Sequence, residues 1–141
     1  MYKSGGSSFK KLLINLPLFS DPRGDLFVAE LQKQLPFGVN RIFIVCNVPA
    51  NEIRGEHAHR ECHQLLVCVK GSVHAVVDNG VSKEEFYLDS PAKGLYLPPM
   101  TWGGQFNYSQ DAVLLVLASH QYSETDYIRN YSHFLDIVRS F

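Results

Sequence analysis

The chain has 141 residues, a length that suits one domain with one hydrophobic core. Its 45% hydrophobic and 12% aromatic residues exclude a disordered chain, and its net charge of −1 gives no general reason to expect nucleic acid or membrane binding. No apolar run reaches the roughly 18 residues of a membrane span. Three cysteines without C-x-x-C spacing indicate neither a disulfide framework nor a zinc site, and favour a reducing, cytoplasmic setting.

Residues 1–9 are expected to form a flexible segment rich in Gly and Ser, and residues 10–141 a single domain. Short apolar runs then follow one another, separated by turn residues, and strands have this length and composition. They are KLLIN (11–15), DLFVAEL (25–31), RIFIVCNV (41–48), QLLVCV (64–69), VHAVV (73–77), EEFYL (84–88), GLYLP (94–98) and AVLLVLAS (112–119). Asn79-Gly80 between two runs predicts a hairpin. Strands without intervening helices predict an all-β sandwich or barrel, in which Cys46 and Cys68 are expected to be buried.

The C-terminal residues have a different, helical period. Their apolar residues are Tyr127, Ile128, Tyr131, Phe134, Leu135 and Val138, which form one stripe. Ser123 and Asp126 resemble a capping box, with Asp in place of the usual Glu. The pattern therefore predicts one C-terminal helix near 124–139.

The most informative segment is RGEHAHRECHQ (54–64). Residues two apart in a strand face the same side, so His57 and His59 share a face. If Gln64 lies on the next inward-facing strand, all three side chains converge inside a barrel. Free imidazoles with a pKa near neutral are good general acids and bases.

This spacing resembles the first cupin motif, in which His-x-His is followed by an acid and then by Gly. Gln64 stands in the acid's place, and Gly71 stands where the motif's Gly should be. The second motif of metal-binding cupins ends in a further histidine, and Trp102 occupies that position here. Because Gln64 is a weak ligand and Trp102 cannot ligate, two histidines make a poor metal site. We therefore expect no metal.

The chain also resembles the sugar-nucleotide 3,4-ketoisomerases, from about residue 10 to 138. The segments that carry the resemblance are DPRGDL (21–26), RGEHAH (54–59), HQLLVCVKGS (63–72), LDSPAKGLY (88–96), YSQDAVLLVLAS (108–119) and DYIRNY (126–131). The resemblance implies a cupin jelly-roll barrel with one C-terminal α-helix, a homodimer that can exchange an N-terminal strand, and no cofactor. It implies a dTDP-linked 4-keto-6-deoxyhexose as substrate and a 3-keto product, which an aminotransferase would convert to a 3-amino sugar for surface glycans.

Moving a ketone from C4 to C3 requires proton transfer at carbon and at oxygen. We assign His57 to the carbon-centred transfer and His59 to the oxygens. Arg54, Gln64 and Trp102 are candidates, on spacing alone, for donors to the enediolate. Related enzymes often have a tyrosine at the position of Phe43, and a phenyl ring cannot assist proton transfer.

The diphosphate of such a substrate needs cations. Arg23 lies in a Gly-containing turn that can present its guanidinium bidentately, and similar enzymes use this arginine on the nucleotide, including from the neighbouring subunit. Arg41 is a second candidate, and Tyr96 could stack on thymine. For His63, His74, His120 and His133 a structural role is expected.

Three other functions compete with the ketoisomerase interpretation. A dTDP-sugar epimerase also uses a barrel, a histidine and D-x-R-G. A metal-dependent cupin such as a dioxygenase is the second. A non-catalytic, sugar-sensing cupin is the third, but no DNA-binding module fits beside the barrel in 141 residues.

Overall fold

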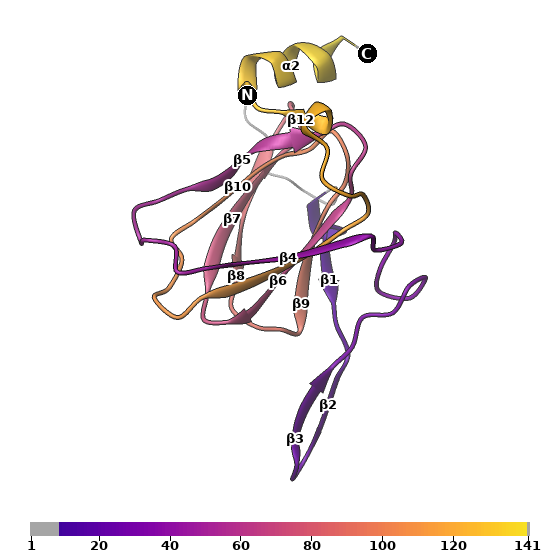
Figure 1. The fold of residues 1–141 in the computed structure, drawn as a ribbon, viewed down its shortest axis with the longest axis vertical. Helices are drawn as coiled ribbons and strands as arrows, with labels where there is room; N and C mark the ends of the chain where they lie inside the picture. Colours follow the sequence, from indigo (N-terminus) through magenta and orange to yellow (C-terminus); the bar gives the residue numbers. More distant parts are fainter. Residues whose placement is uncertain (1–8, 141) are drawn as a thin grey trace.

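The computed structural model describes residues 9–140 and folds them into a jelly-roll barrel of the cupin type, built from two five-stranded antiparallel sheets (Figure 1). The first sheet runs in the order β1 (Leu13–Asn15), β9 (Lys93–Leu97), β6 (Gln64–Lys70), β11 (Val113–Ala118) and β4 (Arg41–Cys46). The second runs β12 (Tyr127–Ile128), β5 (Arg54–His59), β10 (Trp102–Phe106), β7 (Val73–Asp78) and β8 (Lys83–Leu88). The all-β prediction is confirmed.

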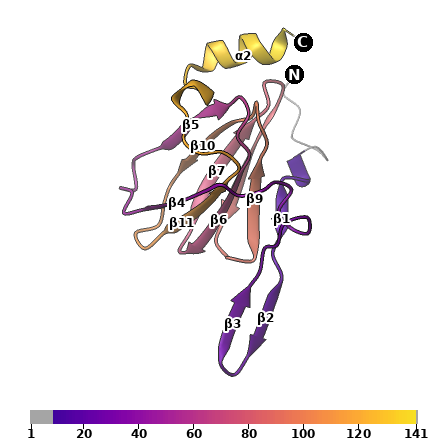
Figure 2. The same cartoon turned by 45° about the vertical axis from the view of Figure 1, so that its right-hand side comes forward.

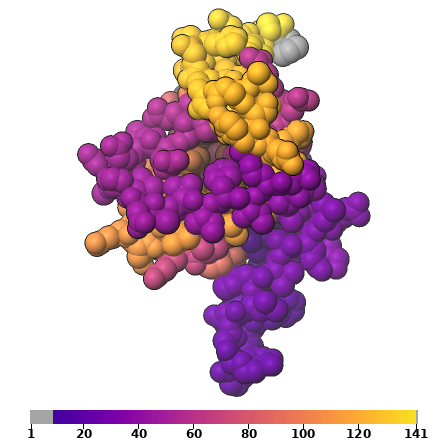
Figure 3. Space-filling model, in the orientation of Figure 1, coloured from indigo at the N-terminus to yellow at the C-terminus, as the bar shows by residue number. Residues whose placement is uncertain are grey.

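A two-stranded hairpin, β2 (Leu18–Asp21) with β3 (Gly24–Phe27), extends away from the barrel. Figure 2 shows it from a second angle, and the space-filling view shows it clear of the rest of the molecule (Figure 3). At the opposite end lie the 3-10 turn η1 (Glu124–Asp126) and the helix α2 (Tyr131–Arg139). No helix within residues 9–140 is long and apolar enough to cross a bilayer.

Each of the predicted apolar runs contains or overlaps a strand. Asn79-Gly80 connects β7 to β8 as predicted, with Asp78 paired to Lys83. The runs did not predict β2, β5, β10 or β12, and of these only β5 was anticipated, as the strand that carries the histidine motif. The strand β10 is Trp-Gly-Gly-Gln-Phe, and glycine has neither the β propensity nor the apolar side chain that marks a strand.

The core lies between the two sheets and follows the alternation of the strands. In β7 the side chains of Val73, Ala75 and Val77 are buried, while His74 and Val76 are only partly so. Phe9, which the sequence analysis placed in the flexible segment, is 2% exposed and packs in this core. Its burial moves the start of the packed chain to Phe9 at the latest. The rest of that segment, 1–8, lies outside the described residues.

Cys46 is exposed, contrary to expectation, whereas Cys68 is buried. The strand β4 alternates with Arg41, Phe43 and Val45 on the more buried side, so that Cys46 falls on the outer face. An apolar run therefore predicted the strand but not which of its faces Cys46 would occupy.

The predicted helix over 124–139 is wrong in its first half, because α2 begins only at Tyr131. Asn130 caps the helix by accepting a hydrogen bond from the His133 amide at 2.9 Å, and Ser123 makes no capping hydrogen bond. Residues 127–128 instead pair with β5, with Tyr127 opposite His59. Pairing to the barrel edge thus overrides the helical period of the sequence.

The helix α2 is fastened over the end of the barrel. Phe134 is fully buried, and its ring centroid lies 5.7 Å from that of Trp102. The Tyr131 hydroxyl donates to Asp78 at 2.5 Å, and the Arg139 guanidinium donates to the Gly80 carbonyl at 3.1 Å. These contacts hold α2, which follows β12, to the β7–β8 hairpin and to β10.

Candidate active site

A cavity of about 270 Å³ opens between the two sheets, beneath the segment that precedes α2. It is lined from the second sheet by Arg54, Gly55, His57, His59, Gly103 and Gln105, and from β12 and its edge by Tyr127 and Arg129. The first sheet contributes Phe43, Val45, Gln64, Leu66, Leu97, Leu114 and Val116, and the connecting loops contribute Cys62, Pro98 and Thr101. The cavity therefore has one apolar wall and one wall rich in hydrogen-bonding groups.

A bulge in β5 aims the histidines into this cavity. Gly103 pairs with His57 and Gly104 with Gly55, so Glu56 is an extra residue on β5. Gly55 has φ +84, and a Cβ there would lie 2.9 Å from the Gln105 side-chain oxygen. A glycine is therefore required at this position both by the backbone conformation and by the close approach of Gln105.

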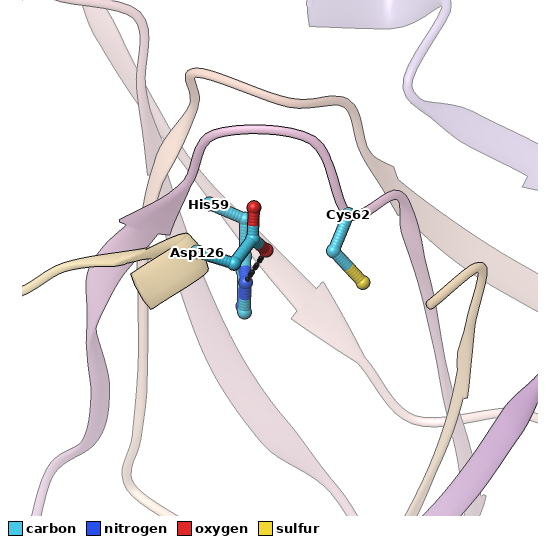
Figure 4. Close-up of side chains that lie close together, drawn as sticks. All are labelled: His59, Cys62 and Asp126. Atoms are coloured by element: carbon cyan, nitrogen blue, oxygen red, sulfur yellow. Dashed lines mark hydrogen bonds and ion pairs between the residues drawn. The ribbon is translucent and has the colours of Figure 1, made fainter. Parts of the chain in front are cut away.

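His57 and His59 lie side by side, as the sequence predicted. Their ring centroids are 4.9 Å apart, with the planes almost perpendicular. His57 Nδ1 lies 3.0 Å from the Gly55 carbonyl oxygen, and His59 Nδ1 lies 2.9 Å from Asp126 Oδ2 (Figure 4). A carbonyl or carboxylate can only accept, so both Nδ1 atoms carry hydrogen and both Nε2 atoms keep a free lone pair. His59 Nε2 is buried and has no hydrogen-bond partner.

The two imidazoles differ in their electrostatic surroundings. Burial, with smaller contributions from the neighbouring His59 and Arg129, lowers the pKa of His57 to about 4, and the hydrogen bond to the Gly55 carbonyl partly opposes this shift. Burial also lowers the pKa of His59, but its hydrogen bond and charge interaction with Asp126 raise it, against Arg41 and Arg129. Both rings are therefore neutral near pH 7, and only His59 has an anion beside it.

Sequence analysis missed the residues that β12 and its flanks contribute. The Tyr127 ring centroid lies 4.8 Å from that of His57 and 4.4 Å from that of His59. The Arg129 guanidinium lies 4.3 Å from the same ring and pairs with Glu124 at 3.2 Å. The segment DYIRNY was noted as a family resemblance, but its helical period concealed that these side chains face a cavity.

Among the predicted site residues, Arg54 and Gln64 line the cavity together with the two histidines. Phe43 lines it too, at the position where related enzymes often have tyrosine. Arg41 is on the same side of β4, and its guanidinium lies 5.2 Å from the Phe43 ring centroid and 5.9 Å from that of Tyr122. Its Nε is buried without a hydrogen-bond partner, although the residue does not line the cavity.

Three of the candidate residues, Tyr96, Trp102 and Arg23, do not line this cavity. Leu97 lines the cavity, so its neighbour Tyr96 points to the other face of the sheet, where its hydroxyl lies 2.6 Å from His63 Nδ1. Trp102 packs beneath α2, with its ring centroid 5.2 Å from that of Tyr131. Arg23 is at the tip of the β2–β3 hairpin, with its side chain 90% exposed and paired to Asp21 at 2.6 Å.

With this geometry in place, comparison with known proteins identifies the family. A family model described as FdtA: WxcM-like, C-terminal matches residues 9–139. This chain belongs to that family.

One named relative is similar to this chain in sequence, and solved structures are similar to it in both sequence and fold. The TDP-4-oxo-6-deoxy-alpha-D-glucose-3,4-oxoisomerase of Aneurinibacillus thermoaerophilus is 43% identical over 122 residues, covering 86% of this chain and 88% of that protein. The sugar 3,4-ketoisomerase QdtA of Thermoanaerobacterium thermosaccharolyticum, solved in complex with TDP, is 36% identical with a TM-score of 0.87, over 91% of this chain and 93% of that one. A 3,4-ketoisomerase from Helicobacter canadensis is 36% identical with a TM-score of 0.86, over 90% and 96%.

Within residues 9–140, one cluster of side chains offers three kinds of atom that can bind a metal ion. His59, Cys62 and Asp126 bring a nitrogen, a sulfur and an oxygen within 4.8 Å of one another (Figure 4). His59 Nδ1 and Asp126 Oδ2 are already joined by a hydrogen bond, so an ion between those two atoms would have to break it.

Proposed function

We propose that this chain is an isomerase that moves the keto group of dTDP-4-keto-6-deoxyglucose from C4 to C3 through an enediol. The observation that carries the proposal is the pair of neutral imidazoles with free Nε2 atoms, side by side in one cavity. The names of the relatives support the reaction and the class of substrate. The volume of about 270 Å³ is at the small end for ligand pockets, which suits one sugar ring.

The two histidines divide the proton transfers. His57 Nε2 removes the proton at C3, which the neighbouring carbonyl acidifies, and the C–H electrons form the C3–C4 double bond of the enediolate. His59 Nε2 accepts the proton of the C3 hydroxyl and passes it to the oxygen at C4. As the new carbonyl forms at C3, His57 returns its proton to C4. One proton has then moved between carbons and one between oxygens, with no net exchange required.

Donors on the cavity wall stabilise the negative charge of the enediolate. Arg54, Gln64 and Arg129 line the cavity and can donate to the two oxygens. Tyr127 also lines the cavity and supplies a phenol, a group that the phenyl ring of Phe43 does not offer. We assign Trp102 and Tyr96 to packing, since neither lines the cavity.

We further propose that two copies of this chain form a homodimer. The projecting hairpin exposes Leu18, Phe19 and Leu26, which are 49%, 62% and 59% exposed. The outer face of β4 exposes Ile42 and Ile44 at 60% and 61%. Apolar surface of this extent on a small protein favours association, and a closed pair buries the same patch twice. The hairpin would then carry Arg23 to the diphosphate at the partner's cavity, with Arg41 as the cation from the same chain.

The dimer is expected to dissociate when the hairpin loses its apolar surface. Phe19→Asp together with Leu26→Asp places charges where the partner would pack, so light scattering should report one chain in place of two. The control Val81→Asp adds an acidic charge to the turn between β7 and β8, at a residue that is 85% exposed and outside the hairpin, and should leave two chains. A wild-type protein that scatters as one chain at all concentrations would contradict the dimer.

The proposed product sets the class of the next reaction. A 3-keto sugar nucleotide is a substrate for an aminotransferase, which would supply a 3-amino-3,6-dideoxyhexose for surface polysaccharides. The cysteines Cys46, Cys62 and Cys68 are free thiols, which agrees with a reducing compartment, and we place the enzyme in the cytoplasm.

Incubation with dTDP-4-keto-6-deoxyglucose in D₂O, read by NMR, tests the function. The ketone is expected to appear at C3, with deuterium at C4 to the extent that the His57 imidazolium exchanges with water before it returns the proton. A product that keeps its ketone at C4 and carries label at C3 or C5 would identify a sugar epimerase instead.

The same assay after EDTA and extensive dialysis tests whether the reaction needs a metal. We expect the rate to persist, because Gln64 and Trp102 stand at cupin ligand positions and His59 Nδ1 is committed to Asp126. Loss of the rate, restored by one equivalent of a divalent ion, would favour a metal-dependent cupin.

A further inference from the structure

We propose that Asp126 positions His59 for proton transfer by dictating which of its ring nitrogens carries hydrogen. The effect of this pair on catalysis rests on the proposed function. The contact itself joins two residues that are far apart in the sequence. His59 is near the end of β5, and Asp126 ends η1 just before β12. The cluster is drawn in Figure 4.

Asp126 is held rigidly by the chain that follows His59. Its Oδ1 accepts from the Glu61 amide at 2.7 Å, and its backbone carbonyl accepts from the Arg60 amide at 2.9 Å. The remaining oxygen, Oδ2, accepts from His59 Nδ1 at 2.9 Å. The side chains of His59 and Asp126 are 7% and 12% exposed, so little water competes for this bond. Two hydrogen bonds to the carboxylate and one to the backbone carbonyl thus hold Asp126 in place before any ligand binds.

An ionised carboxylate can only accept, so His59 must carry its hydrogen on Nδ1 and leave Nε2 as the free base. Although burial would raise the pKa of Asp126, the Glu61 amide and His59 hold that pKa below its usual value and so keep the group ionised. When Nε2 accepts a proton, the carboxylate stabilises the imidazolium that results. Without Asp126, the buried His59 imidazolium would have no negative charge beside it.

The other charged and titratable groups around His59 do not stabilise its protonated form, so that form depends on the Asp126 carboxylate. Arg41 on β4 and Arg129 after β12 both disfavour a proton on His59. His57 on β5 lies 4.9 Å away between ring centroids, and the Tyr127 ring lies 4.4 Å away. Cys62 completes the group from the following loop. Among these groups Asp126 supplies the negative charge beside His59. His57 has no carboxylate in that position, because its Nδ1 faces a backbone carbonyl.

Asp126→Asn tests the proposal because it keeps the shape and removes the charge. The amide oxygen can still accept from Glu61, and the amide nitrogen then faces His59 and favours the opposite tautomer. We expect kcat to fall by about 10- to 100-fold, with KM changed little. The acid limb of the pH profile should move to lower pH, because the pKa of His59 falls without its carboxylate.

Nitrogen NMR of the His59 ring gives a readout that does not depend on turnover. The wild-type ring should show hydrogen on Nδ1, and the Asp126→Asn ring should show it on Nε2 and titrate at lower pH; the His59→Asn variant assigns the signal. On the His59→Asn background, Asp126→Asn should cost no further rate, since Asp126 acts through His59.

Asp136→Asn is the matched control, because it removes one exposed carboxylate from α2 and should change neither the rate nor the spectrum. A folded Asp126→Asn protein with the wild-type tautomer and titration would overturn the proposal, and so would an additive loss on the His59→Asn background. A wild-type protein without ketoisomerase activity would overturn the proposed function, while the ring spectra would still decide the role of Asp126.

Discussion

Replacing His57 or His59 by asparagine is expected to lower kcat by about 10²- to 10⁴-fold, the usual range for the loss of a general acid or base. Each imidazole has a lone pair on Nε2 in the cavity, and asparagine offers only an amide that cannot take up a proton near neutral pH. The rate of appearance of the 3-keto product, followed by NMR or by coupling to an aminotransferase, measures the effect. His57→Asn should also abolish deuterium exchange at C3 in recovered substrate.

The fold is expected to survive both changes, because the rings line the cavity and lie outside the buried apolar cluster between the sheets. His133→Asn on the exposed side of α2 is the control for the loss of one imidazole and should retain wild-type turnover. Near-wild-type kcat in both cavity variants would remove the histidines from the mechanism. A loss in one variant only would reduce the proposed pair to a single base.

Phe134→Ala is expected to lower the free energy of unfolding by about 3 to 5 kcal/mol. Phe134 is fully buried, and its ring contacts Trp102 and Tyr131 where α2 meets the barrel. Truncation leaves a cavity that the surrounding strands cannot close. The same change loosens the chain that leads into α2, so turnover should fall as Asp126 and Tyr127 lose their fixed position. Denaturant unfolding measures the first effect and the ketoisomerase assay the second.

Ser132→Ala, two residues earlier on the exposed face of α2, is the control and should shift the free energy of unfolding by less than about 0.5 kcal/mol. If Phe134→Ala unfolds at the same denaturant concentration as Ser132→Ala, then α2 is not a required part of the packed domain. If stability falls while turnover per folded molecule is unchanged, the helix does not position the site.

The sequence by itself determined the all-β class, as a sandwich or a barrel, and the position of its chemical motif, while the resemblance to the ketoisomerases implied the jelly-roll barrel. Short apolar runs between turn residues, without intervening helices, indicate an all-β fold, and His57 and His59 share a face in any regular strand. The place of Gln64 beside them was conditional on its lying on the next inward-facing strand, which the resemblance to the cupin motif favoured and the structure has as β6. The shared face of the two histidines needs only local geometry, since they are two residues apart in one strand.

Only the tertiary structure decided what the C-terminal segment does. Tyr127, Ile128 and Tyr131 have a helical spacing, yet residues 127–128 pair with β5, because the edge of that sheet offers hydrogen bonds that a free helix end does not. The carboxylate of Asp126 matched a capping pattern, but it bonds to His59, 67 residues earlier. The outward direction of Tyr96 and Trp102 was likewise decided by β-strand alternation and by the docking of α2. These outcomes depend on which distant surfaces meet, and no local pattern in the sequence carries that information.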